Sequence, residues 1–435
     1  CIFCRRLFLC LIATSRRKYM VAPRPLPQQA LATTIAVPSS KSVALRCMLL
    51  ASVARGTSTL TNITFCDDVL ALLQIFDRLQ VAYECRGSTL SIVGRPWQEV
   101  SELPCSESGF LARTVPFLAG VQQTRSYITG RGTLLRRDLS DLTDLFRAAG
   151  GTVSTTHSKL PLNFGTLQPT AEIHVPKLDS SQALSGLLMA LPLISHATSL
   201  TVPLLSSSGY IDATLQCIEV FGGLTREIRS NLSQWEILPS SYTAQSLAIA
   251  GDWSAAAQLM AFLQPSASLT LTNLSATALQ PDRAILELLP QIGISYTWQG
   301  EALHLQGGEV FRAFYYDATH TPDLFPPLTA IAAIAEGIST IGGLHRLRNK
   351  ESDRAQALLT MLQQFGIRAW RKDDELCIEG GKPYPNDIIA TQHDHRIAMA
   401  ATAIAQHAPI PVCLDDTECI KKSFPDFLKI LFAPI

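Results

Sequence analysis

The sequence repeats itself about every 70 residues, and this repeat restricts the possible folds severely. Five segments begin with aspartate, carry apolar residues at positions i, i+3, i+4 and i+7, and mostly end at glycine; they start at Asp68, Asp138, Asp212, Asp282 and Asp353. The pattern predicts amphipathic helices of about three turns, with aspartate as the N-cap and glycine as the stop. Successive starts are 70 to 74 residues apart, so one structural unit recurs along the chain.

A second, more apolar helix is predicted in each unit, ahead of the amphipathic one. Six such segments are present, at residues 42–56, 109–120, 182–194, 254–264, 323–337 and 395–408. Their almost uniform apolar composition predicts burial on all sides. A threonine-rich strand such as 57–63 lies between the two helices, and a short pair of strands follows the second helix.

The repeated unit is therefore strand–helix–strand–helix–strand–strand, in about six copies. Because each copy contains its own helices and sheet, packing into globular halves is favoured over a thin solenoid. We expect an α/β protein of two globular domains, each built from three βαβαββ units with the helices buried and the sheets outside. A cleft then has to lie between the two domains.

The charge balance excludes several classes of partner. The chain has 36 Lys and Arg residues and 36 Asp and Glu residues, so no excess positive charge is available to hold nucleic acid or an anionic membrane. Any anion must be held by a local cluster instead. The 47% hydrophobic and 17% charged content excludes a disordered chain and a coiled coil, and no apolar stretch approaches the ~20 residues of a spanning helix.

The cysteines and the first residues of the chain give information on the cellular compartment of the protein. The eleven cysteines are scattered in apolar surroundings, which indicates reduced thiols and a cytoplasmic protein rather than a disulfide framework. The chain opens CIFCRRLFLCLIATSRRKYM, whose basic pair and short apolar run imitate a signal peptide. The favoured interpretation is upstream sequence translated in frame, with Met20 as the start and residues 1–19 as a non-native or disordered extension. A targeting segment is the alternative.

Polar residues gather at the starts of the buried helices. These starts are Ser39–Arg46, Glu107–Arg113, Ser180–Gln182, Gly251–Ser254, Thr321–Asp323 and Asp394–Arg396. If the units share one orientation within each domain, the starts converge on the cleft. Exposed backbone N–H groups at helix N-termini, together with Arg and Lys side chains, suit phosphate and carboxylate groups.

Taken singly, each of these clusters also has an ordinary structural interpretation. The SSKS segment imitates the end of a phosphate-binding P-loop, but the required G-x-x-x-x-G is missing. The HDHR segment at 393–396 has no companion set of ligands at metal spacing, so no metal is expected. Arg348–Arg354 alone fits a solvated helix start. The recurrence of such features at corresponding places in the repeats is what favours a functional site.

Read in order, these segments closely resemble the EPSP synthase family of enolpyruvyl transferases. The resemblance runs from Ala36 to Phe427. It rests on PSSKSVALR, CDD at 66–68, SSQALSGLLMALPL, SGYIDATL, GDWSAAA, PDLFPPLTAIAA, KESDRAQAL, DHRIAMA and KKSFPDF. It implies one domain of residues 20–39 plus 250–435 and another of residues 40–249, with crossovers near Val37–Ser40 and Ala248–Asp252 that act as the hinge.

The resemblance also implies the reaction. The enolpyruvyl group of phosphoenolpyruvate would pass to the 5-hydroxyl of shikimate 3-phosphate, with release of phosphate, on the route to chorismate and the aromatic amino acids. The chemistry would be addition and then elimination through a tetrahedral intermediate. No cofactor is implied, and a monomer is expected because the two halves of one chain complete the site.

The resemblance assigns residues to each ligand. Those expected to hold shikimate 3-phosphate are Lys41, Ser42, Arg46, Ser180, Ser181, Gln182, Ser207, Tyr210, Asp323 and Lys350. Those expected to hold phosphoenolpyruvate are Lys41, Gly109, Arg137, Gln182, Arg354, Arg396 and Lys422. For catalysis, Asp323 and Lys41 are assigned to the 5-hydroxyl. Glu351 and Lys422 are assigned to proton transfer at the methylene carbon, and the surrounding cations are expected to lower the carboxylates' pKa.

The chain departs from the family pattern near the phosphoenolpyruvate pocket. Glu107 stands where the family commonly has asparagine, which is unfavourable unless Arg113, Arg137 or a proton compensates its charge. Arg346 also replaces an asparagine and is a candidate compensating charge. Phe110 beside Gly109 is expected to narrow the pocket and to reduce inhibition by glyphosate.

The sequence has two alternative functional interpretations. The related enzyme that transfers enolpyruvyl to UDP-N-acetylglucosamine is expected to have Asn after the first lysine and a loop cysteine, whereas this chain has Ser42 and no cysteine in residues 124–137. A catalytically inactive binding or scaffold protein would be expected to lose the acid–base residues. Lys41, Asp323, Glu351 and Lys422 are all present.

Overall fold

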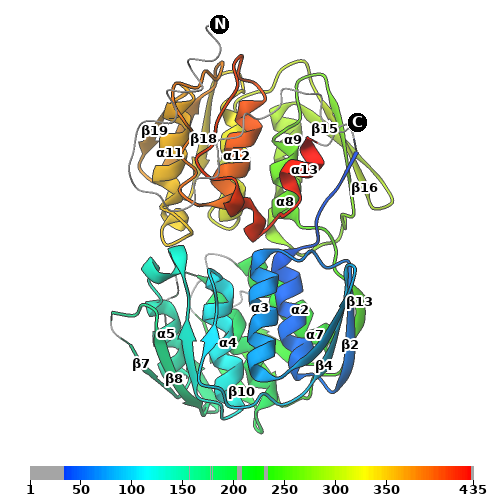
Figure 1. Cartoon of the computed structure of the whole chain (residues 1–435), viewed down its shortest axis with the longest axis vertical. Helices are drawn as coiled ribbons and strands as arrows, with labels where there is room; N and C mark the ends of the chain where they lie inside the picture. The colour runs from blue at the N-terminus through cyan, green and yellow to red at the C-terminus, as the bar shows by residue number, and fades with distance from the viewer. Residues whose placement is uncertain are drawn as a thin grey trace, which may run out of the picture.

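The computed structural model describes residues 34–155, 157–176, 178, 180–202, 208–229 and 234–432. The expectations for residues 1–19 and for Ser207 lie outside these ranges. The molecule has two halves, stacked along its longest axis, with the blue-to-green part of the chain forming the lower half and the yellow-green-to-red part most of the upper half (Figure 1).

The lower half contains three units. The first consists of α2 (Lys41–Val53), β2 (Gly56–Thr61), α3 (Asp67–Leu79), β3 (Ala82–Arg86), β4 (Thr89–Gly94) and β13 (Ser246–Ala248). The second consists of β5 (Leu103–Pro104), α4 (Gly109–Val121), β6 (Ser126–Thr129), η1 (Gly132–Arg136), α5 (Ser140–Ala148), β7 (Gly151–Ser154) and β8 (Leu162–Leu167). The third consists of β9 (Glu172–His174), α6 (Ser181–Ala190), η2 (Leu191–Leu193), β10 (Thr198–Thr201), α7 (Ser208–Val220), β11 (Leu224–Arg229) and β12 (Gln234–Leu238).

The upper half is built on the same plan. One unit consists of β1 (Thr34–Ala36), α8 (Trp253–Met260), β14 (Ser268–Thr272), η3 (Pro281–Ala284), α9 (Ile285–Ile292), β15 (Ile294–Gln299) and β16 (Ala302–Gly307). The next consists of β17 (Tyr315–Asp317), η4 (Pro322–Leu324), α10 (Phe325–Ala332), β18 (Ile338–Gly342), η5 (Leu344–Leu347), α11 (Arg354–Gln364), β19 (Arg368–Lys372) and β20 (Glu375–Glu379). The last contains α12 (His395–Ala405), η6 (Glu418–Lys422) and α13 (Phe427–Leu431).

The sheets follow one topology, with a difference from the expected six copies. Within the described ranges five sheets have four strands each, in the orders β13-β2-β4-β3, β5-β6-β8-β7, β11-β12-β10-β9, β1-β14-β16-β15 and β17-β18-β20-β19. In each sheet one parallel pair joins two antiparallel pairs. In its described part the sixth unit has only the isolated bridge between Ile389 and Leu414 in place of a four-stranded sheet, so the C-terminal copy of the repeat has fewer strands than the others.

Two strands complete sheets whose other strands lie far from them in the sequence. β1 comes before the lower half in sequence but pairs with β14 of the upper half, and β13, at the end of the lower half, pairs with β2. The chain therefore crosses between the halves twice, and the crossovers form an antiparallel bridge from Ser39 to Gly251. Gly251 is required here because a Cβ atom would lie 2.2 Å from the main-chain oxygen of Asn273.

Each half has its own hydrophobic core. One cluster of buried residues extends from Ala44 to Ile249, and the other joins Ile35 and Val37 to residues between Trp253 and Leu431. The apolar helices are buried as expected, with every residue of α12 and all but one of α4 inaccessible. Within the described part of the chain, no helix is both long and apolar enough to cross a membrane. From the two cores we propose domains of residues 34–39 with 250–432, and of residues 40–249.

The repeated aspartates have more than one role. Only Asp353 is an N-cap as expected, accepting from the Gln356 N–H at 3.1 Å. Asp212 lies inside α7, while Asp68 and Asp282 turn toward the space between the halves, where they bind side chains instead of capping their helices. The expectation that all five are N-caps was therefore wrong, because tertiary partners compete for these carboxylates.

Candidate active site

The N-termini of the six buried helices meet at one cavity between the halves. The cavity has a volume of about 150 Å³. Each helix contributes residues at its start: Lys41 and Ser42, Gly109 and Phe110, Ser180 to Gln182, Asp252 and Ser254, Pro322 and Asp323, and His395 and Arg396. The prediction that the helix starts converge on a cleft is confirmed. Helix N-termini attract anions, so this arrangement favours anionic ligands.

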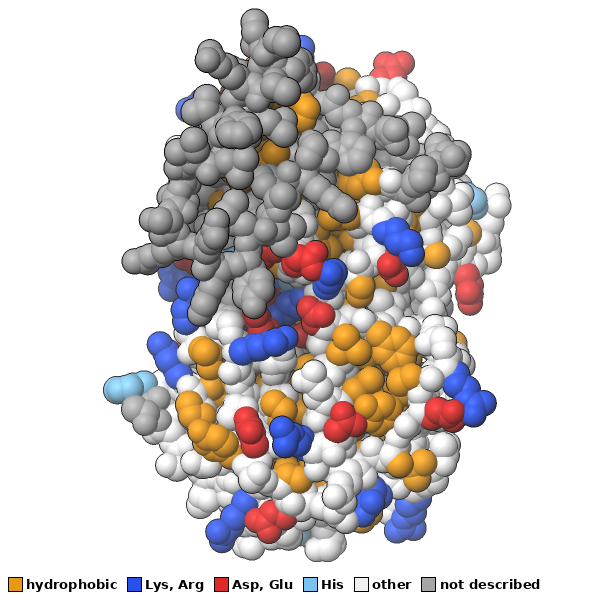
Figure 2. Space-filling view, viewed as in Figure 1, with side chains coloured by type: hydrophobic (Ala, Val, Ile, Leu, Met, Phe, Trp, Pro, Cys, Tyr) orange, Lys and Arg blue, Asp and Glu red, His pale blue; other side chains and the backbone are white. Residues whose placement is uncertain are grey.

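The cavity wall is strongly cationic although the chain is neutral overall. Nine Lys or Arg side chains line it, against five Asp or Glu side chains. Along the waist of the molecule, basic and acidic side chains alternate on the surface (Figure 2). The excess of cations is therefore local, as expected for a site that binds phosphate or carboxylate groups.

Most of the residues expected from the sequence line this cavity. They are Lys41, Ser42, Arg46, Gly109, Arg137, Ser180, Ser181, Gln182, Tyr210, Asp323, Lys350, Glu351, Arg354 and Arg396. Lys422 borders a neighbouring cavity of about 430 Å³ instead, but its Nζ lies 3.6 Å from Oε1 of Glu351, so it remains beside the main cavity. Ser207 is outside the described residues.

The Arg46 side chain is held rigidly in the lower half. It is fully buried, and its Nε donates to Oγ1 of Thr214 at 2.7 Å while Nη1 donates to the main-chain oxygen of Ser42 at 2.8 Å. Its guanidinium group lies over the Phe110 ring, 4.7 Å from the ring centre. The Phe110 ring thus packs against the Arg46 guanidinium group and helps to position this cation. Phe110 is one of the residues that depart from the family pattern.

Five ionic groups of the upper half form a connected cluster. Asp323 accepts from Nη1 of Arg354 with one oxygen and from Nη2 of Arg396 with the other, both at 2.8 Å. Arg354 also donates to Glu351 at 2.6 Å and to the fully buried Asp394 at 2.8 Å. Asp394 in turn N-caps α12, which fixes the position of the helix start that bears Arg396.

The cations decide the ionisation of the two central carboxylates. Burial alone would raise the pKa of Asp323, but Arg396, Arg354 and Lys350 outweigh burial and lower it. Burial would likewise raise the pKa of Glu351, but Arg354, Arg137 and Lys422 hold it well below its usual value. The expectation that the cations lower these pKa values is confirmed, so both groups are ionised at neutral pH.

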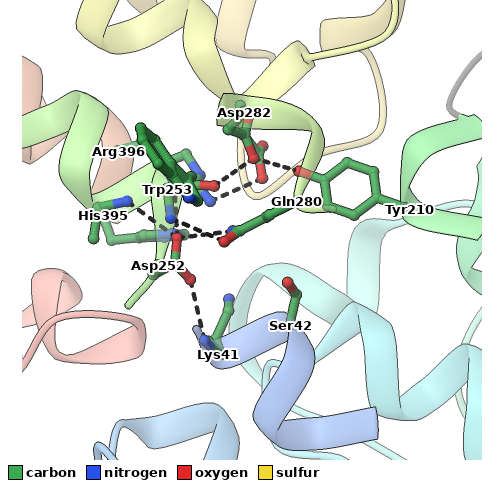
Figure 3. A network of polar contacts seen from close by, with 12 residues as sticks. Lys41, Ser42, Tyr210, Asp252, Trp253, Gln280, Asp282, His395 and Arg396 are labelled. Atoms are coloured by element: carbon green, nitrogen blue, oxygen red, sulfur yellow. Dashed lines mark hydrogen bonds and ion pairs between the residues drawn. The ribbon is translucent and has the colours of Figure 1, made fainter. Parts of the chain in front are cut away.

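Lys41 connects the lower half to the crossover. Its Nζ donates to Asp68 at 2.9 Å, and its main-chain N–H donates to Oδ2 of Asp252 at 3.1 Å. Burial would lower the pKa of the Lys41 ammonium group, but Asp68, Cys66 and Glu351 together outweigh burial and raise it. Lys41 is therefore a cation in the resting site, poised between the halves (Figure 3).

Asp282, Ser254 and His395 lie in or beside the site but were not assigned to a ligand from the sequence. Tyr210 of the lower half donates to Asp282 of the upper half, which also accepts from Ser254 at 2.7 Å (Figure 3). His395 is fully buried in the cavity wall, and neither ring nitrogen has a hydrogen-bond partner among the described residues. Burial holds its pKa well below the usual value, so the ring is neutral. The D-H-R segment itself was the signal that pointed to His395.

Glu107 does not face the main cavity with its carboxylate. The carboxylate accepts from the N–H and Oγ1 of Thr133 and borders the neighbouring cavity. Neither Arg113 nor Arg137 forms an ion pair with it among the described contacts: Arg113 pairs with Asp141, and Arg137 with Glu351 at 3.3 Å. Arg113 and Arg137 therefore do not compensate the charge of Glu107 through an ion pair, and Glu107 does not line the main cavity.

Comparisons with known proteins agree with this geometry. Residues 26–431 match the family described as EPSP synthase (3-phosphoshikimate 1-carboxyvinyltransferase). A protein of Clostridium kluyveri named 3-phosphoshikimate 1-carboxyvinyltransferase is 30% identical over 397 residues, covering 90% of this chain and 92% of that protein. A Clostridioides difficile protein of the same name is 30% identical over 413 residues, covering 91% and 93%.

Solved structures extend the comparison to the fold. The structure of EPSP synthase from Acinetobacter baumannii superposes with a TM-score of 0.76 at 25% identity, covering 93% of this chain and 96% of that one. The enolpyruvyl transferase NikO from Streptomyces tendae has the same fold, with a TM-score of 0.71 at 15% identity over 92% of this chain and 94% of that one. By its sequence over nearly the whole length, this chain belongs to the EPSP synthase family.

Proposed function

We propose that this protein is a 3-phosphoshikimate 1-carboxyvinyltransferase, which transfers the enolpyruvyl group of phosphoenolpyruvate to the 5-hydroxyl of shikimate 3-phosphate. The observation that carries the proposal is the meeting of Lys41, Arg137, Arg354 and Arg396 from both halves around Asp323 and Glu351 in one cavity. Two ligands that each bear a phosphate and a carboxylate need such a concentration of fixed cations.

Shikimate 3-phosphate is assigned mainly to the lower half. Its phosphate lies at the start of α6, where Ser180 and Ser181 offer hydroxyl groups next to exposed backbone N–H groups. Arg46, Ser42, Gln182 and Tyr210 hold its carboxylate and ring. The resemblance also assigns Ser207 to the phosphate, but this residue lies outside the described ranges. From the upper half, Lys350 and Asp323 reach its hydroxyl groups. The rigid network around Arg46 supports its role as a fixed anchor.

Phosphoenolpyruvate is assigned to the junction of the halves. Arg137 and Gly109 of the lower half face Arg354, Arg396 and Lys422 of the upper half. A Cβ atom at Gly109 would lie 2.6 Å from Nη1 of Arg137, so the absence of a side chain at Gly109 leaves room for this guanidinium group. Lys41 contacts both ligands because it lies where the two assigned sites meet.

The addition step forms a bond between the 5-hydroxyl oxygen and C2 of phosphoenolpyruvate. Asp323, held by two arginines, orients the hydroxyl with Lys41 and accepts its proton as the bond forms. The methylene carbon C3 gains a proton from the Lys422 ammonium group. The cations around the site stabilise the negative charge of the tetrahedral intermediate.

The elimination step reverses the proton transfer at C3. Glu351 is ionised and lies 3.6 Å from Lys422, so the pair can remove a proton from the C3 methyl group while the C2–phosphate bond breaks. Over both steps the hydroxyl proton leaves with inorganic phosphate, and the product carries the enolpyruvyl ether.

We further propose a monomeric, cytoplasmic enzyme. Two halves of a single chain supply every assigned residue, which supports activity without a second subunit. In the described part of the chain, free thiols are found at Cys47, Cys66, Cys85, Cys105, Cys217, Cys377 and Cys419, which agrees with a reducing compartment. The retention of Lys41, Asp323, Glu351 and Lys422 at one site argues against an inactive scaffold, and Ser42 after Lys41 argues against UDP-N-acetylglucosamine as acceptor.

The test is a phosphate-release assay on protein that starts at Met20, with phosphoenolpyruvate and shikimate 3-phosphate added separately and together. The proposal predicts release only with both, with one enolpyruvyl product formed per phosphate. Glu351→Gln and Lys422→Met are the controls for the catalytic groups. An absence of release by the unmodified protein would contradict the proposal.

A further inference from the structure

Glu107 contacts both walls of the phosphoenolpyruvate site without facing the ligand. It is partly buried and comes directly before Ser108, the N-cap of α4. Its carboxylate and its main-chain oxygen point to different partners, one in the lower half and one in the upper half. Neither contact is explained by binding of a substrate to Glu107 itself.

The carboxylate holds the turn that leads to Arg137. Its Oε2 accepts from the Thr133 N–H at 3.3 Å and from Thr133 Oγ1 at 3.1 Å. The contact depends on Gly132, which has a φ of +57° and whose Cβ, if it had one, would lie 2.2 Å from Oε1 of Glu107. The carboxylate therefore rests directly on the bare backbone at the start of η1.

Thr133 connects Glu107 to Arg137 through hydrogen bonds. Thr133 is buried, and its Oγ1 accepts from Nη2 of Arg137 at 3.4 Å, while the same Nη2 lies 3.3 Å from Oε1 of Glu351. The Nε of Arg137 is buried without a hydrogen-bond partner in the part of the chain that the structure describes. The guanidinium group thus has spare donor capacity, and Thr133 is the lower-half contact that fixes its direction.

The main-chain oxygen of Glu107 holds Lys422. The Nζ of this buried lysine donates to it at 2.8 Å across the junction of the halves. Glu107 belongs to the lower half and Lys422 to the upper half, so the contact forms only when the halves are close together. Lys422 is oriented by this carbonyl and by Glu351, 3.6 Å away.

We propose that Glu107 is a positioning residue for phosphoenolpyruvate, which acts through Thr133 on Arg137 and through its main-chain oxygen on Lys422. The inference rests on the proposed function, since it takes Arg137 and Lys422 as the groups that hold this substrate. It predicts an effect on phosphoenolpyruvate, not on shikimate 3-phosphate, whose assigned residues Glu107 does not touch.

The test compares Glu107→Ala, Glu107→Gln and Thr133→Val. Steady-state KM for each substrate is measured, together with calorimetric binding of phosphoenolpyruvate to the enzyme saturated with shikimate 3-phosphate. Glu107→Ala is expected to weaken phosphoenolpyruvate binding about tenfold, as loss of one charge-assisted contact would, with KM for shikimate 3-phosphate unchanged. Glu107→Gln is expected to stay within about threefold, since its amide oxygen still accepts from Thr133.

A double-mutant cycle tests the route through Thr133. If Glu107 acts on Arg137 through Thr133, the double variant Glu107→Ala/Thr133→Val binds phosphoenolpyruvate no more weakly than Thr133→Val alone. Additive effects of the two changes would overturn this route. Should Glu107→Ala fail to fold, Thr133→Val carries the test, and an unchanged phosphoenolpyruvate affinity in it would refute the proposal.

Glu102→Ala is the matched control. Glu102 lies in the same unit and accepts from Oγ1 of Thr129 at 2.6 Å, but it borders neither of the two cavities. Its removal is expected to leave both KM values unchanged. The outcomes separate the two proposals: normal turnover with unchanged binding in the Glu107 variants refutes only the positioning role. Absence of turnover in the unmodified enzyme refutes the proposed function, while the calorimetric comparison still tests Glu107.

Discussion

The Tyr210 hydroxyl group donates a 2.9 Å hydrogen bond to Oδ2 of Asp282, and the bond joins the two halves of the molecule across the cleft (Figure 3). Asp282 is fully buried, and its second oxygen has no hydrogen-bond partner within the described ranges. Burial and the neighbouring Asp323 raise its pKa to about 6. Tyr210 is assigned to shikimate 3-phosphate, so the ionisation of Asp282 is expected to make the junction between the two halves sensitive to pH.

Asp282→Asn is expected to stabilise the protein at pH 7.5 but not at pH 4. The pKa of Asp282 in the folded state is above its usual value, so the neutral form favours folding, and this stability is lost as pH rises from about 4 through about 6. A shift of about two units corresponds to about 3 kcal/mol, which the amide would recover. Urea unfolding of both proteins at several pH values measures this, and a difference that does not change with pH would contradict it.

Affinity for shikimate 3-phosphate is expected to fall above about pH 8. Burial, followed by the neighbouring arginines, lowers the pKa of Lys350 to about 8, although Asp323 opposes the shift. Below that pH the ammonium group is charged and attracts the ligand; above it the charge is lost, and KM is expected to rise by up to about tenfold per pH unit. Lys350→Arg stays charged, so its KM should remain flat to pH 9.5. The same rise in both proteins would rule out Lys350 as the cause.

Glu351→Gln is expected to lower kcat about 10²- to 10⁴-fold, with a smaller change in KM. The amide oxygen still accepts from Arg354, so the cluster around Asp323 keeps its geometry, while the base is lost. Because the cations hold the pKa of Glu351 well below its usual value, kcat of the unmodified enzyme should show no acidic limb from this group between pH 5 and 7. Single-turnover kinetics measures the chemical step, and a variant with normal kcat would exclude Glu351 as the base.

Asn62 and Asn273 are expected to stabilise the hinge as a pair. Both have left-handed backbones, with φ of 59° and 67°, and they follow the corresponding strands β2 and β14. Asn62 donates to Ile249 O at 2.6 Å, and Asn273 donates to Val37 O at 2.7 Å, so each holds a crossover strand segment.

Asn273→Gly keeps the backbone conformation and removes only the side-chain bonds, so it should cost about 1–2 kcal/mol of unfolding free energy. Asn273→Ala should cost about 1 kcal/mol more because alanine is strained at positive φ. Denaturant unfolding of the two variants separates the cost of the lost side-chain hydrogen bonds from the cost of backbone strain. Equal stability of the glycine variant and the unmodified protein would show that the amide contacts contribute nothing.

Much of the site was predictable because the sequence repeat indicates how the buried helices are arranged. Six equivalent helices with polar starts, arranged in two globular halves, place those starts at one junction, and Lys41, Arg354 and Arg396 lie there. The local pattern of each helix was enough to predict that the helix starts meet at one junction. The roles of single side chains depended on the resemblance to the family, and they remain proposals.

The remaining features depend on partners far away in the sequence. Asp68 and Asp282 look like N-caps, but Lys41 and Tyr210 bind them instead. The pairing of β1 with β14 and of β13 with β2 is non-local, and no local pattern encodes it. The direction of the Glu107 side chain could not be read from its position in the family pattern, because it depends on the bare backbone at Gly132 and on Thr133.

Cations from both halves surround one cavity, and their joint role is tested most directly by a crystal structure of Glu351→Gln with shikimate 3-phosphate and phosphoenolpyruvate bound. The expected result has the sugar phosphate at Ser180 and Ser181, phosphoenolpyruvate between Arg137 and Arg354, and Nζ of Lys41 within hydrogen-bonding distance of both ligands. Either ligand bound outside the cavity, or Lys41 paired only with Asp68, would contradict the shared site.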